Sequence, residues 1–116
     1  MPYCRVSVQD NVGVMELELP IIVDASEFDR LNEMVVAAAD GQPGGRWVLD
    51  LSNVKYIGSA MLGLMVNLRQ RIKSGGGKLV LCGLSAQLGK AMATTSLHTL
   101  FAMTETRVQA IRLAAR

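Results

Sequence analysis

Two short and almost wholly apolar runs occupy residues 47–51 and 78–82, and one segment with the period of a helix lies between them. Such runs are typical of strands that are buried on both faces of a sheet. Strands joined through a single helix run parallel, with a crossover that is nearly always right-handed. The chain is therefore predicted to form an α/β fold. In the helix between the two strands, the apolar residues at spacings of 4, 3 and 4 are Met61, Met65, Leu68 and Ile72.

The first part of the chain is predicted to add a hairpin and a helix. Residues 3–8 and 12–19 are strand-like, and the turn-forming sequence Asp-Asn-x-Gly lies where they meet. Asp24 and Glu27 have the spacing of a capping box, so a helix should begin there and end at the glycine-rich stretch 41–45. Its expected inward stripe consists of Phe28, Leu31, Val35 and Ala38.

The last part of the chain continues the alternation. Ser85 is predicted to cap a helix over residues 86–93, residues 101–103 to form a short strand, and Thr104 to cap a final helix. One α/β domain is expected over residues 1–116, with a mixed sheet of about four to five strands and about four helices. The residues of the final helix expected to face inward are Val108, Ile111 and Ala115.

Composition excludes several classes of protein. Half of the residues are hydrophobic, 19% are charged and the net charge is +2, which excludes a disordered chain and gives no reason to expect a nucleic-acid partner. The apolar runs fall short of the roughly 18 residues of a membrane span, so no direct membrane insertion is expected. Two cysteines do not make a disulfide framework, and no signal peptide precedes the first strand, so the expected location is cytoplasmic.

The charges are divided unevenly along the chain. Residues 1–50 carry nine acidic and three basic residues, for a net charge of −6, whereas residues 51–116 carry nine basic residues and one acid, for a net charge of +8. We expect the first two helices to lie side by side on one sheet face, so that the two halves largely compensate each other. The helix residues concerned are Glu27, Asp29 and Glu33 in the first helix and Arg69, Arg71 and Lys73 in the second.

No arrangement of residues indicates catalysis or a cofactor. His98 is the only histidine, and neither a His-Glu-x-x-His nor a paired Cys-x-x-Cys motif occurs, so we predict no enzyme activity, no metal and no cofactor. The glycines 75–77 end a helix and begin a strand, which is the wrong context for a phosphate-binding loop. Gly58 and Gly63 have better context, but Leu64 stands where a lysine would meet the phosphates.

Two residues at the start of the second helix each allow two interpretations. Ser59 is placed either to cap the helix or to accept a phosphate, which the helix N-terminus would stabilise. Met61 either packs in the core or belongs to an adaptable apolar contact surface for a partner. The sequence leaves both alternatives open.

The segment 48–63, Val-Leu-Asp-Leu-Ser-Asn-Val-Lys-Tyr-Ile-Gly-Ser-Ala-Met-Leu-Gly, together with the order of elements, resembles the STAS domain shared by sulfate transporters and bacterial anti-sigma factor antagonists. In that family a strand ending Asp-Leu-Ser is followed by three variable residues, an aromatic residue, then Ile-Asp-Ser-Ser-Gly-Leu-Gly and a helix. Residues 75–82 and 97–103 are similar to its later segments. The resemblance covers nearly the whole chain and implies a single STAS-like domain.

The resemblance implies a non-enzymatic regulator of transcription. In the family, a partner kinase that is also an anti-sigma factor phosphorylates the second serine, and only the unphosphorylated antagonist binds that kinase. The implied partner of this chain is an anti-sigma factor with kinase activity or another STAS protein. The resemblance does not decide whether the chain forms an oligomer. The residues expected to contact the partner are Asp24, Gly58, Ser59, Ala60, Met61 and Leu62.

The chain departs from the family pattern at three positions. Gly58 replaces the aspartate, Ala60 the phosphorylated serine and Met61 the glycine. Ala60 has no hydroxyl, so the usual phosphorylation cannot occur there, and Ser59 is the remaining candidate acceptor. An alternative interpretation is a small STAS subunit of a membrane transport assembly of the lipid-transfer type.

Overall fold

The computed structural model describes residues 3–42, 44–56 and 58–116 and contains the predicted order of elements. Pro43 of the predicted helix end and Ile57 of the STAS-like segment lie outside the described residues. A short 3₁₀ helix, η1, is added before the last strand. The elements are β1 (Tyr3–Gln9), β2 (Val12–Leu19), α1 (Ala25–Asp40), β3 (Arg46–Val54), α2 (Ser59–Ser74), β4 (Lys78–Cys82), α3 (Ala86–Thr94), η1 (Leu97–Leu100), β5 (Ala102–Thr104) and α4 (Arg107–Ala115).

The predicted mixed sheet is confirmed. Its five strands lie in the order β1-β2-β3-β4-β5; β1 and β2 are antiparallel, and the other neighbours are parallel. In the hairpin turn, Asp10 and Asn11 have φ angles of 54° and 63°. Two-residue hairpin turns need this left-handed conformation, and Asp and Asn adopt it more readily than other residues with a side chain.

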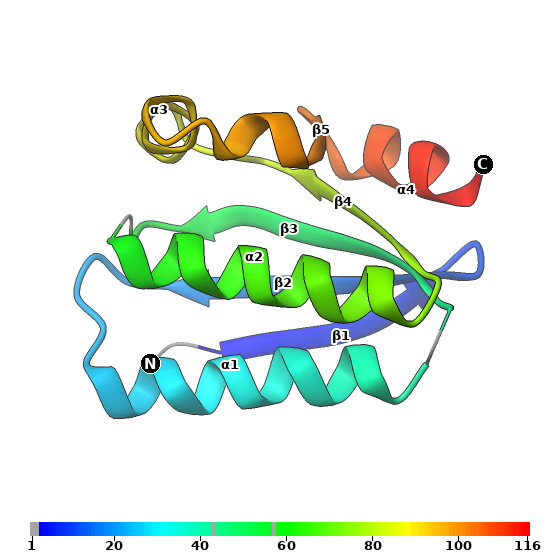
Figure 1. Ribbon diagram of the computed structural model, residues 1–116, viewed down its shortest axis with the longest axis horizontal. Helices are drawn as coiled ribbons and strands as arrows, with labels where there is room; N and C mark the ends of the chain where they lie inside the picture. Colours follow the sequence, from blue (N-terminus) through cyan, green and yellow to red (C-terminus); the bar gives the residue numbers. More distant parts are fainter. Residues whose placement is uncertain (1–2, 43, 57) are drawn as a thin grey trace.

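The sheet separates two apolar clusters. In Figure 1, α1 and α2 lie side by side, run in the same direction and cover one face of the sheet. Successive residues of β3 alternate between the faces, so Trp47 and Leu49 pack under α1 and α2, whereas Val48 packs under α4. α4 presents the small residues Ala110 and Ala114, which lets it lie close to the sheet.

Side chains from the strands hold the C-terminal end of α4. The guanidinium of Arg46 donates to the carbonyls of Ala115 and Arg116, the latter at 2.9 Å, and Lys78 Nζ donates to the carbonyl of Leu113 at 2.7 Å. The last carbonyls of a helix have no partner within the helix, so these two cations satisfy groups that would otherwise need water.

The capping interpretation of Ser59 and the predicted cap at Thr104 are wrong. Ser59 is the first residue of α2, and the cap position belongs to Gly58, which has no side chain to accept a hydrogen bond. Thr106, not Thr104, caps α4 through a hydrogen bond from the Gln109 amide, because Thr104 extends β5 instead. The predicted caps at Asp24 and Ser85 are confirmed.

The residues predicted to face the core are largely correct for α1 and α2 and largely wrong for α4. All four predicted residues of α2 are buried, and α1 differs only in burying Ala39 more deeply than Ala38. In α4, Ile111 is buried as predicted, but Val108 is 60% exposed and Ala115 is exposed. The face of α4 that packs on the sheet is instead the one that carries its alanines Ala110 and Ala114.

The charged halves compensate each other only in part. Arg71 Nη1 lies 3.2 Å from Asp40 Oδ2, which joins α2 to α1 at their C-terminal ends. Because the two helices run in the same direction, the acids near the start of α1 are remote from the bases near the end of α2. Within the described residues, Glu27, Asp29 and Glu33 form no ion pair.

Candidate functional site

The loops that follow β2, β3 and β4 meet at one edge of the sheet, because these strands are parallel (Figure 1). This edge carries the predicted site residues, with Asp24 before α1 and Gly58 and Ser59 at the start of α2. The Lys55 amide donates to the Leu19 carbonyl at 2.9 Å and so ties the first two loops together. Ligands of open α/β sheets typically bind outside this edge.

The carboxylate of Asp24 is occupied by the start of α1. It accepts hydrogen bonds from the Glu27 amide and the Ser26 hydroxyl, both at 2.8 Å, and the Glu27 carboxylate reaches back to the Asp24 amide at 3.5 Å. These hydrogen bonds, first of all that from the Glu27 backbone, lower the pKa of Asp24. The capping role of Asp24 is confirmed, and its contact with a partner stays a prediction.

The first turn of α2 presents a small and uncharged surface. Ser59 and Ala60 are exposed, and Gly58 and Leu62 are half-buried. No side chain caps the helix and no acid lies in its first turn, so the positive end of its dipole is uncompensated. Met61 is fully buried on the core face of the helix. The prediction that Met61 contacts a partner is therefore wrong, and its core interpretation is correct.

Tyr56 accounts for the glycine at position 58, and the sequence reasoning missed this contact. A Cβ atom on Gly58 would overlap the hydroxyl and ring of Tyr56. The Tyr56 ring packs on Phe28 of α1, with 5.6 Å between the centroids, and so joins the starts of α1 and α2. The aspartate of the family pattern would fit here only if Tyr56 moved. In the sequence, the only signal for this contact was an aromatic residue, Tyr56, two positions before the glycine.

Two exposed isoleucines follow β2 at the same edge. Ile21 is 72% exposed and Ile22 is 85% exposed. We call Ile21, Ile22, Gly58, Ser59 and Ala60 the edge surface. Contiguous exposed apolar patches are typical of surfaces that contact other proteins. The signal missed in the sequence was a pair of large apolar residues outside any predicted element. Beside Ile21 is a hollow of about 440 Å³, lined also by Ser52, Val54, Lys55, Ser85 and Gln87.

A buried ion pair lies beneath this edge, on the α4 side of the sheet. Asp50 is 5% exposed; it accepts from Arg107 Nε and Nη2 at 2.8 Å, and from the Ser52 amide at 3.0 Å and hydroxyl at 2.6 Å. Burial raises the pKa of Asp50, but the hydrogen bonds from Ser52 and Arg107 outweigh it, so that the net pKa lies below the ordinary value. Arg107 also pairs with Glu16 at 3.2 Å. The network fixes Ser52, which lines the hollow.

Both cysteines, Cys4 and Cys82, are free thiols. Burial raises the pKa of Cys4 to about 11 and that of Cys82 to about 12, so neither thiol is an activated nucleophile at neutral pH. Among the described residues, no group of three or more His, Cys, Asp or Glu side chains could hold a metal ion. In the same part of the chain, no helix has the length and apolarity needed to cross a membrane.

Comparison with known proteins bears out the resemblance. The STAS domain family model matches residues 3–110. The fold is similar to an anti-sigma-factor antagonist (STAS) domain protein from Planctomyces limnophilus, with 23% identity, TM-score 0.84 and coverage of 97% of this chain and 98% of that chain. An anti-sigma factor antagonist from Mycobacterium paratuberculosis gives 18% identity, TM-score 0.85 and coverage of 100% and 96%. The Bacillus cell fate determinant SpoIIAA in its phosphorylated form is 14% identical, with a TM-score of 0.69 and coverage of 95% of this chain and 97% of that chain. No curated protein matches the sequence.

Proposed function

Because this chain belongs to the STAS domain family, we propose that it is a non-enzymatic module that binds a partner protein through the edge surface, in the manner of an anti-sigma factor antagonist. The proposed partner is a bacterial anti-sigma factor with serine kinase activity, or another STAS protein, and the proposed location is the cytoplasm. The observation that carries the proposal is the exposed pair Ile21 and Ile22, of which Ile21 also lines the hollow. Asp24 and Leu62 are proposed as contacts at the margin of this surface.

The chemistry of the edge surface suits a protein partner. Burying one isoleucine side chain stabilises a complex by about 1.5–3 kcal/mol before the cost of association is counted. Ser59 and Ala60 are small, so a partner backbone can come close to the start of α2. The uncompensated helix dipole there favours a negatively charged group of the partner.

We propose that any phosphorylation switch of this chain acts at Ser59. Its side chain is exposed in the first turn of α2, and a phosphate there would be stabilised by the positive end of the helix. The same phosphate would oppose docking, since its charge would repel the negatively charged group of the partner that the helix dipole favours there. Ala60 offers no hydroxyl for this chemistry.

Ile22→Asp is expected to abolish partner binding. The exposed side chain makes no contribution to the core, so the substitution puts a charge on the edge surface without unfolding the protein. Purified candidate kinases and STAS proteins from the source genome would be titrated by calorimetry against the wild type and the variant. Val108→Asp, an equally charged change at an exposed residue of α4, serves as the control and should bind like the wild type. Unchanged binding by Ile22→Asp would rule out the edge surface.

Incubation with ATP and the cognate kinase is expected to add one phosphate, which intact-mass spectrometry detects. Ser59→Ala should show no mass increase. The matched control Ser74→Ala, which removes an exposed serine at the other end of α2, should show the same increase as the wild type. A mass increase that persists in Ser59→Ala would place the phosphate elsewhere and contradict the proposed switch.

A further inference from the structure

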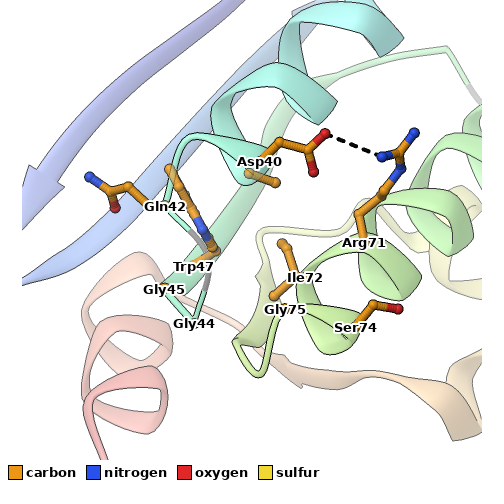
Figure 2. Close-up of a pocket in the computed structure, with 10 residues that line it drawn as sticks. Asp40, Gln42, Gly44, Gly45, Trp47, Arg71, Ile72, Ser74 and Gly75 are labelled. Atoms are coloured by element: carbon orange, nitrogen blue, oxygen red, sulfur yellow. Dashed lines mark hydrogen bonds and ion pairs between the residues drawn. The ribbon is translucent and has the colours of Figure 1, made fainter.

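A second hollow, of about 330 Å³, lies at the other end of the molecule from the edge surface. Figure 2 shows it between the C-terminal ends of α1 and α2 and the start of β3. Its walls combine apolar side chains, Ala39 and Ile72, with the polar groups of Asp40, Trp47 and Arg71. The volume lies within the range of small-molecule sites, which begins at roughly 300 Å³.

Trp47 brings an unused hydrogen-bond donor to this hollow. The residue is 3% exposed, and its indole Nε1 is buried without an acceptor among the described residues. Buried indole N–H groups normally have an acceptor. In Figure 2 the indole nitrogen lies beside Gly45, and a Cβ atom at that position would come within 3.0 Å of it. A side chain at position 45 would therefore crowd both this nitrogen and the Gln42 carbonyl, which lies 2.8 Å from the same Cβ position.

The opposite wall carries one charge of each sign. Arg71 and Asp40 form their 3.2 Å ion pair with both side chains about half exposed, 51% and 50%. An exposed pair of this kind adds little stability, so either partner can turn to a ligand at small cost. The C-terminal end of α1, which has no basic residue in its last turn, adds the negative end of its dipole beside Asp40. The hollow thus offers donors to an acidic group and a negative region to a cation.

We propose that this hollow binds a small zwitterion of the α-amino acid class. The carboxylate of the ligand accepts hydrogen bonds from Trp47 Nε1 and the Arg71 guanidinium, and its ammonium group binds the Asp40 carboxylate. The side chain of the ligand packs on Ala39 and Ile72. This site is separate from the edge surface and does not depend on the proposed partner.

Trp47 makes the test direct, because it is the only tryptophan in the chain. The full chain would be titrated with each common L-α-amino acid at neutral pH while the fluorescence emission is recorded. At least one amino acid is expected to give a saturable change, together with a rise in melting temperature. Arg71→Gln should weaken that binding at least tenfold. Lys73→Gln, in the same last turn of α2 but outside the hollow, should bind like the wild type.

Each remaining outcome would overturn the proposal. No saturable change with any amino acid would mean that the hollow does not bind this class of ligand. Equal binding by Arg71→Gln would place the ligand elsewhere. Equal binding of the same ligand without its ammonium group would exclude a zwitterion as the preferred class.

Discussion

Gly83→Ala is expected to lower the free energy of unfolding by about 3 kcal/mol, as measured by urea denaturation. Gly83 has a φ of 72°, and the left-handed conformation costs a residue with a side chain about 1–2 kcal/mol. The added Cβ would also overlap Ser52 Oγ and lie 2.9 Å from the Ser52 amide nitrogen. Ser52 cannot retreat easily, because its amide and hydroxyl are both bonded to Asp50.

Gly89→Ala is the matched control for this prediction. Gly89 lies inside α3, and a Cβ atom there would meet nothing within 4 Å. Alanine is the better helix former, so this variant should be as stable as the wild type or up to about 1 kcal/mol more stable. Equal stability of Gly83→Ala and the wild type would show that the turn between β4 and α3 does not need a glycine.

Arg107→Ala is expected to cost about 3 kcal/mol at neutral pH, because it leaves the buried carboxylate of Asp50 without its cation. The two hydrogen bonds from Ser52 remain and keep the expected cost at the lower end of the usual range. Arg112→Ala removes an exposed arginine from the same helix, one with no ion pair among the described residues, and should change stability by less than about 0.5 kcal/mol. Urea denaturation of both variants gives the comparison.

The cost of Arg107→Ala should depend on pH in a defined direction. Asp50 has a lower pKa in the folded than in the unfolded state, so it contributes stability that is complete above about pH 4 and is lost as the pH falls through the folded pKa. Removal of Arg107 takes away one cause of the lowered pKa. The stability difference between wild type and variant should therefore shrink below about pH 4. A difference that stays constant down to pH 2 would contradict the role of this pair.

The parts of the fold that the sequence predicted correctly depend on neighbouring residues. The cap of α1 joins Asp24 to a residue three positions later, and the buried stripe of α2 repeats over about three turns. Both features involve residues that are close together in the sequence, so the spacing of residue types predicts them. α4 is different: it has nine residues, and two small alanines face the sheet while Val108 faces solvent. Hydrophobicity alone predicts that the valine faces the sheet. The small alanines face it instead, because they allow the helix to pack close to the strands.

The sequence predicted that the candidate residues lie at one edge of the sheet, but it did not predict the contacts among them. The chain order places the starts of α1 and α2 at one edge of the sheet, which the resemblance also implied. The contacts that shape this edge join residues far apart in the sequence, such as Tyr56 with Phe28 and Asp50 with Arg107. Their pairing depends on which side chains face each other after folding, and no spacing in the chain encodes it.

The attachment of α4 has a consequence for how the protein opens. Arg107 ties its first turn to β3, and Arg46 and Lys78 bind its last carbonyls from the starts of β3 and β4. Release of α4 would break all of these bonds together and expose Val48 and Val80 to water. Fraying of this helix is therefore coupled to the central strands, so its amide hydrogens should exchange with those of the sheet as one cooperative unit. Any species that has lost α4 presents a bare apolar sheet face, which makes it prone to aggregate.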